Sequence, residues 1–315
     1  MSKTDGKLKK QLVIGTPSGI GDISWIWSKL VGLTDEYDIV FDVADGVPRR
    51  AHNYLKLLPE LKGYRYGRFD FPFIQTWGAT NDITTWAAIK ERGNGQEFLQ
   101  PNFHILNGGL LQDWLPDLPT NFHYEMATKG EDKISAEEMI KDAEASTIIG
   151  IHAASIRGAK AWNTWMRKSW LELMQSINRD LKGDVMFVLM GAYWDDLTKS
   201  LQDKNLKTKD LCGKTTVAEV LEIHKRIDGY IGFSSGLGVL RTVLGLPTFM
   251  LWPDWQYLHI YGWAPPEMVK DGSYSGVIYS DVETVYEGFV KRWLDEHVLQ
   301  NTKGEVVTER KLRVL

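Results

Sequence analysis

The chain has 315 residues, of which 43% are hydrophobic and 25% charged, so it is long enough for two globular domains. Its formal net charge of −4 excludes the overall basic field that drives non-specific nucleic-acid binding. Cys212 is the only cysteine, which excludes an internal disulfide. No apolar run is long enough to span a bilayer, and the basic N-terminus lacks an apolar signal core. We therefore expect a cytoplasmic protein without an integral membrane segment.

The chain begins with an apolar strand at residues 12–14, a glycine-rich loop and a helix over residues 22–32. Glycines such as Gly21 allow the loop to turn tightly and to approach a ligand. Asp22 lies at the predicted helix start, where a carboxylate is favoured and where α/β sheets place their chemistry. Asp22 is therefore a candidate catalytic residue. The alternative is that it only caps the helix.

A strand over residues 37–43 and a helix over residues 49–58 follow. Arg49 and Arg50 begin that helix, and they either bind an anionic acceptor or form a solvated face. The aromatic, Pro- and Gly-rich stretches beyond it, residues 64–82 and 92–124, show no regular pattern. Non-repetitive sequence of this length predicts binding loops.

We place a domain boundary within residues 130–146, where a polar stretch precedes a predicted capping box from Ser135 to Glu138. The first domain is then residues 1–140 and the second is residues 141–285. The remaining segment, residues 286–315, is a helix that packs back across the domains and a tail.

Strand-like and helix-like runs alternate in the second half, which predicts a parallel α/β sheet. A second capping box joins Thr216 to Glu219. The predicted strands with their loops are at residues 147–155, 184–191, 229–238 and 247–253, and the predicted helices are at residues 168–181, 194–203, 215–227, 239–245 and 281–298.

The first loop of the second half carries Ser155 and Lys160 after a buried strand. Small residues let backbone N–H groups reach a phosphate, and an ammonium balances its charge. The alternative is a loop with ordinary surface cations. His152 precedes this loop, and we expect it to be a near-core histidine. No histidine or cysteine has metal-ligand spacing, so we expect no metal and no cofactor.

The next two loops contain further candidate ligand-binding residues. Gly191 ends a strand, and Asp195 beyond it either accepts hydrogen bonds from ribose hydroxyls or caps a helix. The strand over residues 229–233 leads into a helix start that offers hydroxyls and backbone N–H groups to a diphosphate. That cradle consists of Ser234, Ser235, Gly236, Leu237 and Gly238.

Together these segments resemble the heptosyltransferase-like glycosyltransferases, glycosyltransferase family 9, which have the GT-B fold. The segment GIGDISWIWSKL resembles the family's opening loop, HAASIRGAKAW its phosphate loop, and MGAYWD its G-A-x-x-E motif. The resemblance covers most of residues 12–32 and 147–253. It implies an α/β protein with two Rossmann-like domains facing across a cleft. Where the family has Asp and His in its last motif, this chain has Ser234 and Val239.

The resemblance implies an inverting, metal-independent glycosyltransferase. Asp22 is then the general base, Asp195 binds the donor ribose, and Ser155 and Lys160 bind the donor phosphates. The partners are a nucleoside-diphosphate sugar and a surface glycan of lipopolysaccharide-core type, bound near Gly21. We expect a monomer.

Two alternatives stay open. A bacteriophage DNA-modification enzyme would glycosylate a hydroxymethylated pyrimidine, with Trp77, Trp86 and Trp114 available to stack on a flipped base. The other alternative is a non-catalytic module that binds sugar nucleotides. The departures at Ser234 and Val239 motivate it, whereas the presence of Asp22 in its loop favours an enzyme.

Overall fold

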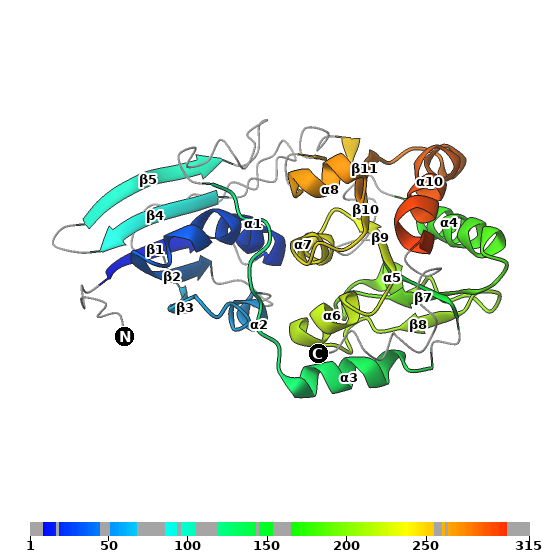
Figure 1. Ribbon diagram of the computed structural model, residues 1–315, viewed down its shortest axis with the longest axis horizontal. Helices are drawn as coiled ribbons and strands as arrows, with labels where there is room; N and C mark the ends of the chain where they lie inside the picture. Colours follow the sequence, from blue (N-terminus) through cyan, green and yellow to red (C-terminus); the bar gives the residue numbers. More distant parts are fainter. Residues whose placement is uncertain are drawn as a thin grey trace. The chain divides into compact units, whose positions relative to one another are not determined.

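The structure is a computed structural model that describes residues 9–16, 19–44, 51–67, 86–92, 96–104, 119–142, 145–153, 165–254, 260–261 and 264–300. The chain forms two compact units, Met1–Ala127 and Thr128–Leu315, and each contains its own sheet with helices (Figure 1). Among the described residues, no helix combines the length and the apolar character needed to cross a bilayer. The prediction of two Rossmann-like α/β domains is confirmed.

The sheet of the first unit is mixed, in the order β3-β2-β1-β4-β5. β1, β2 and β3 are parallel, whereas β4 is antiparallel to both β1 and β5. The prediction that residues 64–82 and 92–124 are irregular is therefore wrong where β3 and β5 form. Polar residues and a proline within β5 obscure its strand character, and such residues are tolerated at the edge of a sheet. The strands are β1 (Lys10–Thr16), β2 (Tyr37–Ala44), β3 (Gly63–Gly67), β4 (Trp86–Arg92) and β5 (Gln96–His104).

The main helix of the first unit is α1 (Ile20–Leu30), followed by the short 3₁₀ turn η1 (Val31–Leu33). Its apolar face is buried, and the ring of Trp27 lies 5.9 Å from that of Phe41 on β2. The helix α2 (His52–Leu55) has only four residues, fewer than the predicted 49–58. The last described segment of the unit, residues 119–127, is hydrogen-bonded to both α1 and α2. Asn121 N–H donates to the Ser28 carbonyl of α1, and the hydroxyl of Tyr124 shares a hydrogen bond with that of Tyr54 on α2.

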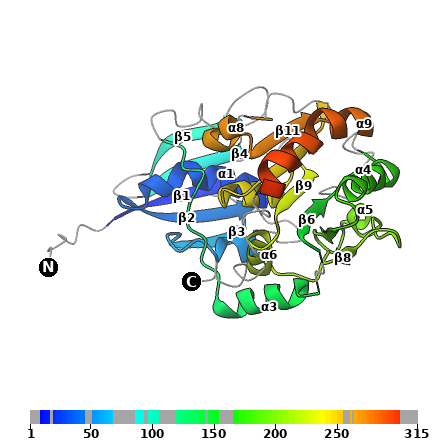
Figure 2. The ribbon, with the colours of Figure 1, turned by 45° about the vertical axis from the view of Figure 1, so that its right-hand side comes forward.

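The second unit has six parallel strands in the order β11-β10-β9-β6-β7-β8. Numbered along the chain from β6, this is the doubly wound order 3-2-1-4-5-6. β6 and β9 are neighbours, and the chain builds the sheet outward in opposite directions from this pair (Figure 2). In such sheets ligands bind at the carboxyl ends of the two strands where the order reverses. The strands are β6 (Thr147–His152), β7 (Val185–Leu189), β8 (Thr208–Asp210), β9 (Gly229–Phe233), β10 (Thr248–Trp252) and β11 (Tyr274–Ile278).

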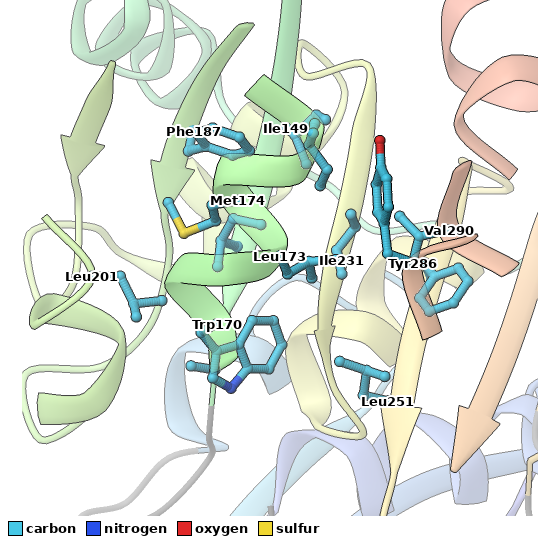
Figure 3. Packing of buried hydrophobic residues seen from close by; sticks show 14 of the residues in the cluster. Ile149, Trp170, Leu173, Met174, Phe187, Leu201, Ile231, Leu251, Tyr286 and Val290 are labelled. Carbon is cyan, nitrogen blue, oxygen red and sulfur yellow. The ribbon is translucent and has the colours of Figure 1, made fainter. Parts of the chain in front are cut away.

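Apolar side chains on both sides of this sheet form its core. Trp170, Leu173 and Met174 project from α4 (Arg167–Asp180) toward Ile149 on β6 and Phe187 on β7 (Figure 3). The central strands are buried on both faces, which is why they appear in the sequence as continuous apolar runs. Between α4 and the final helix, the described chain forms α5 (Asp196–Lys199), α6 (Val217–His224), α7 (Gly236–Val243) and α8 (Pro266–Asp271).

The last described helix belongs to the core of the second unit. It runs through α9 (Val282–Val285), η5 (Tyr286–Val290), α10 (Lys291–Trp293) and η6 (Leu294–Val298). Tyr286 and Val290 pack beside Ile231 of β9 (Figure 3). The apolar face of this helix is buried on the sheet of its own unit, and the prediction that the helix packs back across the domains stays a prediction. Residues 301–315 lie outside the described residues.

The boundary between the units falls at residue 127 rather than at residue 140. The helix α3 (Gly130–Ile140), with Lys129 as its N-cap residue, follows this boundary and therefore belongs to the second unit. It lies beside α6 in both ribbon views (Figures 1 and 2). Ser135 lies inside α3, and its hydroxyl donates to Glu219 at 2.5 Å instead of forming the predicted capping box. The box from Thr216 to Glu219 at the start of α6 is confirmed.

Glu222 of α6 links the start of the second unit to this helix. Its buried carboxylate accepts hydrogen bonds from Thr128, Lys225 and Arg226. Burial alone would raise the pKa of Glu222, but these hydrogen bonds outweigh burial and lower the pKa to about 2. The folded-state pKa is below the unfolded one, so the stabilisation is complete above pH ~4.5 and is lost as pH falls toward 2.

We therefore expect Glu222→Gln to lower the free energy of unfolding by about 2 kcal/mol at neutral pH and to flatten its pH dependence between pH ~4.5 and ~2. Urea unfolding at a series of pH values measures both effects. Glu172→Gln, at an exposed position of α4, is the control. If the free energy of unfolding depended on pH in the same way in wild type and in Glu222→Gln, the lowered pKa of Glu222 would be contradicted.

Candidate functional site

Three polar side chains of the second unit lie at the carboxyl edge of its sheet, one at the end of a strand and two in loops. His152 is the last residue of β6, Asp195 follows β7, and Ser235 follows β9. β6 and β9 are the two strands at which the order of the sheet reverses. The sequence predicted Asp195 and Ser235 as ligand-binding residues, and the structure brings them together around His152.

His152 contacts both of these residues. Its Nδ1 lies 3.0 Å from Ser235 Oγ, and its Nε2 lies 3.3 Å from Asp195 Oδ2. The residue is 2% exposed, so the prediction of a near-core histidine is confirmed, but the sequence did not reveal its partners. The ring thus joins the β7–α5 loop to the β9–α7 loop.

Asp195 is a buried carboxylate with one oxygen occupied and one available. The residue is 4% exposed, and Oδ2 also accepts a hydrogen bond from Ala192 N–H at 2.7 Å. Within the described part of the chain, Oδ1 has no hydrogen-bond partner. Asp195 occupies the N-cap position of α5, yet its side chain caps no backbone N–H there. The capping alternative therefore does not account for this acid, and Oδ1 is suited to accept a hydrogen bond from a ligand.

Gly191 provides the space that this carboxylate needs. A Cβ atom built at residue 191 would lie 2.6 Å from Asp195 Oδ2 and 3.1 Å from Asp195 Cβ. The contact is too close for any side chain, so glycine at this position fixes how the loop folds over the acid. The Gly191 carbonyl in turn accepts a hydrogen bond from Gly213 N–H at 2.8 Å.

We expect Gly191→Ala to displace the Asp195 carboxylate and to lower the free energy of unfolding by about 1–3 kcal/mol. The affinity for any ligand that hydrogen-bonds to Asp195 should fall at least ~10-fold. Thermal unfolding and titration calorimetry measure the two effects. Gly288→Ala is the matched control, because nothing lies within 4 Å of a Cβ built there. Unchanged ligand affinity in Gly191→Ala would contradict this role.

The start of α7 forms the other side of the site. Ser235 is the N-cap residue, but its hydroxyl makes no side-chain cap bond and faces His152 instead. The first helical residues, Gly236, Leu237 and Gly238, therefore present a helix start that the Ser235 side chain does not cap, which is a favourable place for a phosphate. Gly238 also allows close packing, since a Cβ there would lie 2.5 Å from Met250 Cε.

Two uncharged groups lie in the core near this cluster. Burial lowers the pKa of His224 well below its usual value, and burial raises the pKa of Tyr230. The ring nitrogens of His224 have no hydrogen-bond partner among the described residues. Both groups therefore stay uncharged at physiological pH.

In the first unit, Asp22 is the third residue of α1 and Gly21 is the second. The Asp22 carboxylate folds back over Gly19, where it occupies the space that a Cβ of residue 19 would need. The side chain is only partly buried. This placement suits an acid at a helix start and keeps the carboxylate at the carboxyl end of β1.

Several predicted site residues lie outside the described residues. They are Arg49 and Arg50 in the first unit and Ser155 and Lys160 in the second, and their roles stay predictions. Among the residues that the structure describes, no group of three His, Cys, Asp or Glu side chains is placed to hold a metal ion.

The cluster contains the residue types of a Ser-His-Asp triad, and residues 232–236 have the Gly-x-Ser-x-Gly spacing of a nucleophile elbow. The geometry differs from that of such hydrolases in two ways. The elbow serine would be Ser234, whereas the serine on the histidine is Ser235. In addition, the serine contacts Nδ1 and the aspartate Nε2, the reverse of the hydrolase arrangement. The cluster is therefore better suited to hold a ligand than to activate a nucleophile.

No protein-family model matches the sequence, and no curated protein sequence matches it. Solved structures do match. The Escherichia coli ADP-heptose lipopolysaccharide heptosyltransferase II aligns with a TM-score of 0.61 and 14% identity over 93% of this chain and 99% of that one. A family 9 glycosyltransferase from Veillonella parvula aligns with a TM-score of 0.55 and 11% identity over 90% and 89% of the two chains. The chain has the fold of these glycosyltransferases. Each alignment extends over both units, so the two-domain GT-B architecture is common to all three.

Proposed function

We propose that this protein is a glycosyltransferase that moves a sugar from a nucleoside diphosphate to an acceptor hydroxyl. The observation that carries the proposal is the available, buried Oδ1 of Asp195 at the reversal point of the second sheet, beside the α7 start. The fold shared with two glycosyltransferases supports it.

The second unit holds the donor in this proposal. Asp195 accepts a hydrogen bond from a ribose hydroxyl, and the diphosphate lies at the start of α7 near Ser234, Ser235 and Gly236. Backbone N–H groups and the helix dipole then stabilise the negative charge of the leaving diphosphate. Ser155 and Lys160 add a hydroxyl and an ammonium to the same phosphates, which lets the reaction proceed without a metal ion.

Asp22 is the general base. Its carboxylate takes the proton from the acceptor hydroxyl as that oxygen forms a bond to the anomeric carbon. The bond from this carbon to the diphosphate oxygen breaks at the same time, and the configuration at the carbon inverts. We propose a surface glycan of lipopolysaccharide-core type as the acceptor, with Gly21, Arg49 and Arg50 contributing to its binding.

Hydroxymethylated DNA stays a prediction from the sequence. Of the three tryptophans that motivate it, Trp86 begins β4, and Trp77 and Trp114 lie outside the described residues. We therefore keep modified DNA as an arm of the acceptor screen.

A thermal-shift screen with ADP-, UDP-, GDP- and CMP-linked sugars tests donor binding. A ligand at ~100 times its dissociation constant adds about 2.7 kcal/mol, which raises the melting temperature by a few degrees. We expect a shift with one nucleotide family that falls to about half or less in Asp195→Asn and is kept in the control Asp254→Asn. No shift with any donor would contradict the proposal.

A transfer assay in EDTA then tests the reaction. Lipopolysaccharide-core glycans and hydroxymethylated DNA are incubated with the donor found above, and mass spectrometry records the product. We expect a gain of one sugar and the release of a nucleoside diphosphate. Donor binding without transfer to any acceptor would instead support a non-catalytic module.

A further inference from the structure

His152 is positioned to control two parts of the proposed donor site at once. It is almost fully buried and lies between Asp195 and Ser235, on loops that are far apart in the sequence. Its backbone is fixed by the sheet, since His152 is in register with Gly232 on β9. The next residue is held as well, because Ala153 N–H donates to the Thr198 hydroxyl at 3.0 Å.

The direction of the hydrogen bonds follows from the chemistry of the groups. An ionised carboxylate only accepts, so the proton on the side of Asp195 is on His152 Nε2. In that tautomer Nδ1 accepts from the Ser235 hydroxyl. Asp195 Oδ2 thus receives two N–H groups, from His152 at 3.3 Å and from Ala192 at 2.7 Å. These two donors fix the plane of the carboxylate and leave Oδ1 as its available acceptor.

We propose that His152 is a positioning residue that orients Asp195 so that Oδ1 accepts a hydrogen bond from a ribose hydroxyl of the donor. The same ring holds the Ser235 hydroxyl away from the N–H groups at the start of α7, and those groups stay open to the diphosphate. This inference rests on the proposed function, because it assumes a nucleoside diphosphate at Asp195.

A comparison of two ligands separates orientation of Asp195 from general support of the fold. The probes are ADP and 2′,3′-dideoxy-ADP, or the same pair with the base that the donor screen selects. Wild type should bind the complete ribose at least ~10-fold more tightly, as expected for hydrogen bonds to a charged group. A residue that only supports the fold would weaken both ligands equally and leave their affinity ratio unchanged.

Two conservative variants differ in which partner they can reach. In His152→Gln the amide nitrogen extends to about the position of Nε2, so it can still donate to Asp195. In His152→Asn the amide reaches only the position of Nδ1, on the side of Ser235. We expect His152→Gln to keep most of the affinity ratio and His152→Asn to reduce it to within ~2-fold of unity, as in Asp195→Asn.

His224→Leu is the matched control, because the ring of this second buried histidine makes no hydrogen bond among the described residues. It should leave the ratio as in wild type. A ratio that survives in His152→Asn, or a wild type that binds both ligands equally, would overturn the inference. If no nucleoside diphosphate binds wild type at all, the proposed function itself fails.

Discussion

Replacing Asp22 with Asn is expected to lower the turnover of sugar transfer by about 10³-fold while the affinity for the donor stays within about 2-fold of wild type. The amide is the same size as the carboxylate, but it cannot take a proton from the acceptor hydroxyl. The donor is proposed to bind through the second unit, so its dissociation constant should not depend on this charge. Single-turnover transfer and donor titration measure the two quantities.

The same variant also tests the helix-capping interpretation. Asp22 folds back over Gly19 at the start of α1, so the loss of its charge is expected to cost up to about 1 kcal/mol of stability. Asp35→Asn, at an exposed acid of the same unit, is the control for both readouts. Normal transfer with lowered stability in Asp22→Asn would show that this acid only caps its helix.

Replacing Arg241 with Met is expected to lower the free energy of unfolding by about 3–5 kcal/mol. The guanidinium is completely buried in α7 and donates to four backbone carbonyls, those of His224, Ile227, Asp228 and Pro247. It therefore joins the end of α6 to the segments that enter β9 and β10. A methionine fills much of the volume but leaves the four carbonyls without this donor.

Urea unfolding measures this loss. Arg179→Met is the control, because Arg179 is exposed at the end of α4 and pairs only with its neighbour Asp180 among the contacts described, so a change below about 1 kcal/mol is expected there. A loss below about 1 kcal/mol in Arg241→Met would contradict the central role of this guanidinium in the packing of α6 and α7.

The fold of the second unit could be predicted in detail from the sequence, and that of the first unit only in part. The parallel strands β6, β7, β9 and β10 are buried on both faces, so each is a continuous apolar run with a glycine or polar boundary. β4 and β5 carry charged residues and a proline, and their pairing is antiparallel, which no local pattern of this chain indicates.

The candidate site was predictable residue by residue but not as an assembly. Asp195 and Ser235 each follow a buried strand, and this position is what marked them as candidates. The link between them is His152, whose partners are 43 and 83 residues away along the chain. Hydrogen bonds over such separations depend on the order of the strands in the sheet, which a single sequence does not specify.

Titration calorimetry with the best nucleoside diphosphate tests the central claim most directly. The account predicts one-to-one binding to wild type, the same affinity in Asp22→Asn, and an affinity at least ~10-fold weaker in Asp195→Asn. Equal binding to wild type and Asp195→Asn would contradict the claim that the carboxyl edge of the second sheet holds the donor.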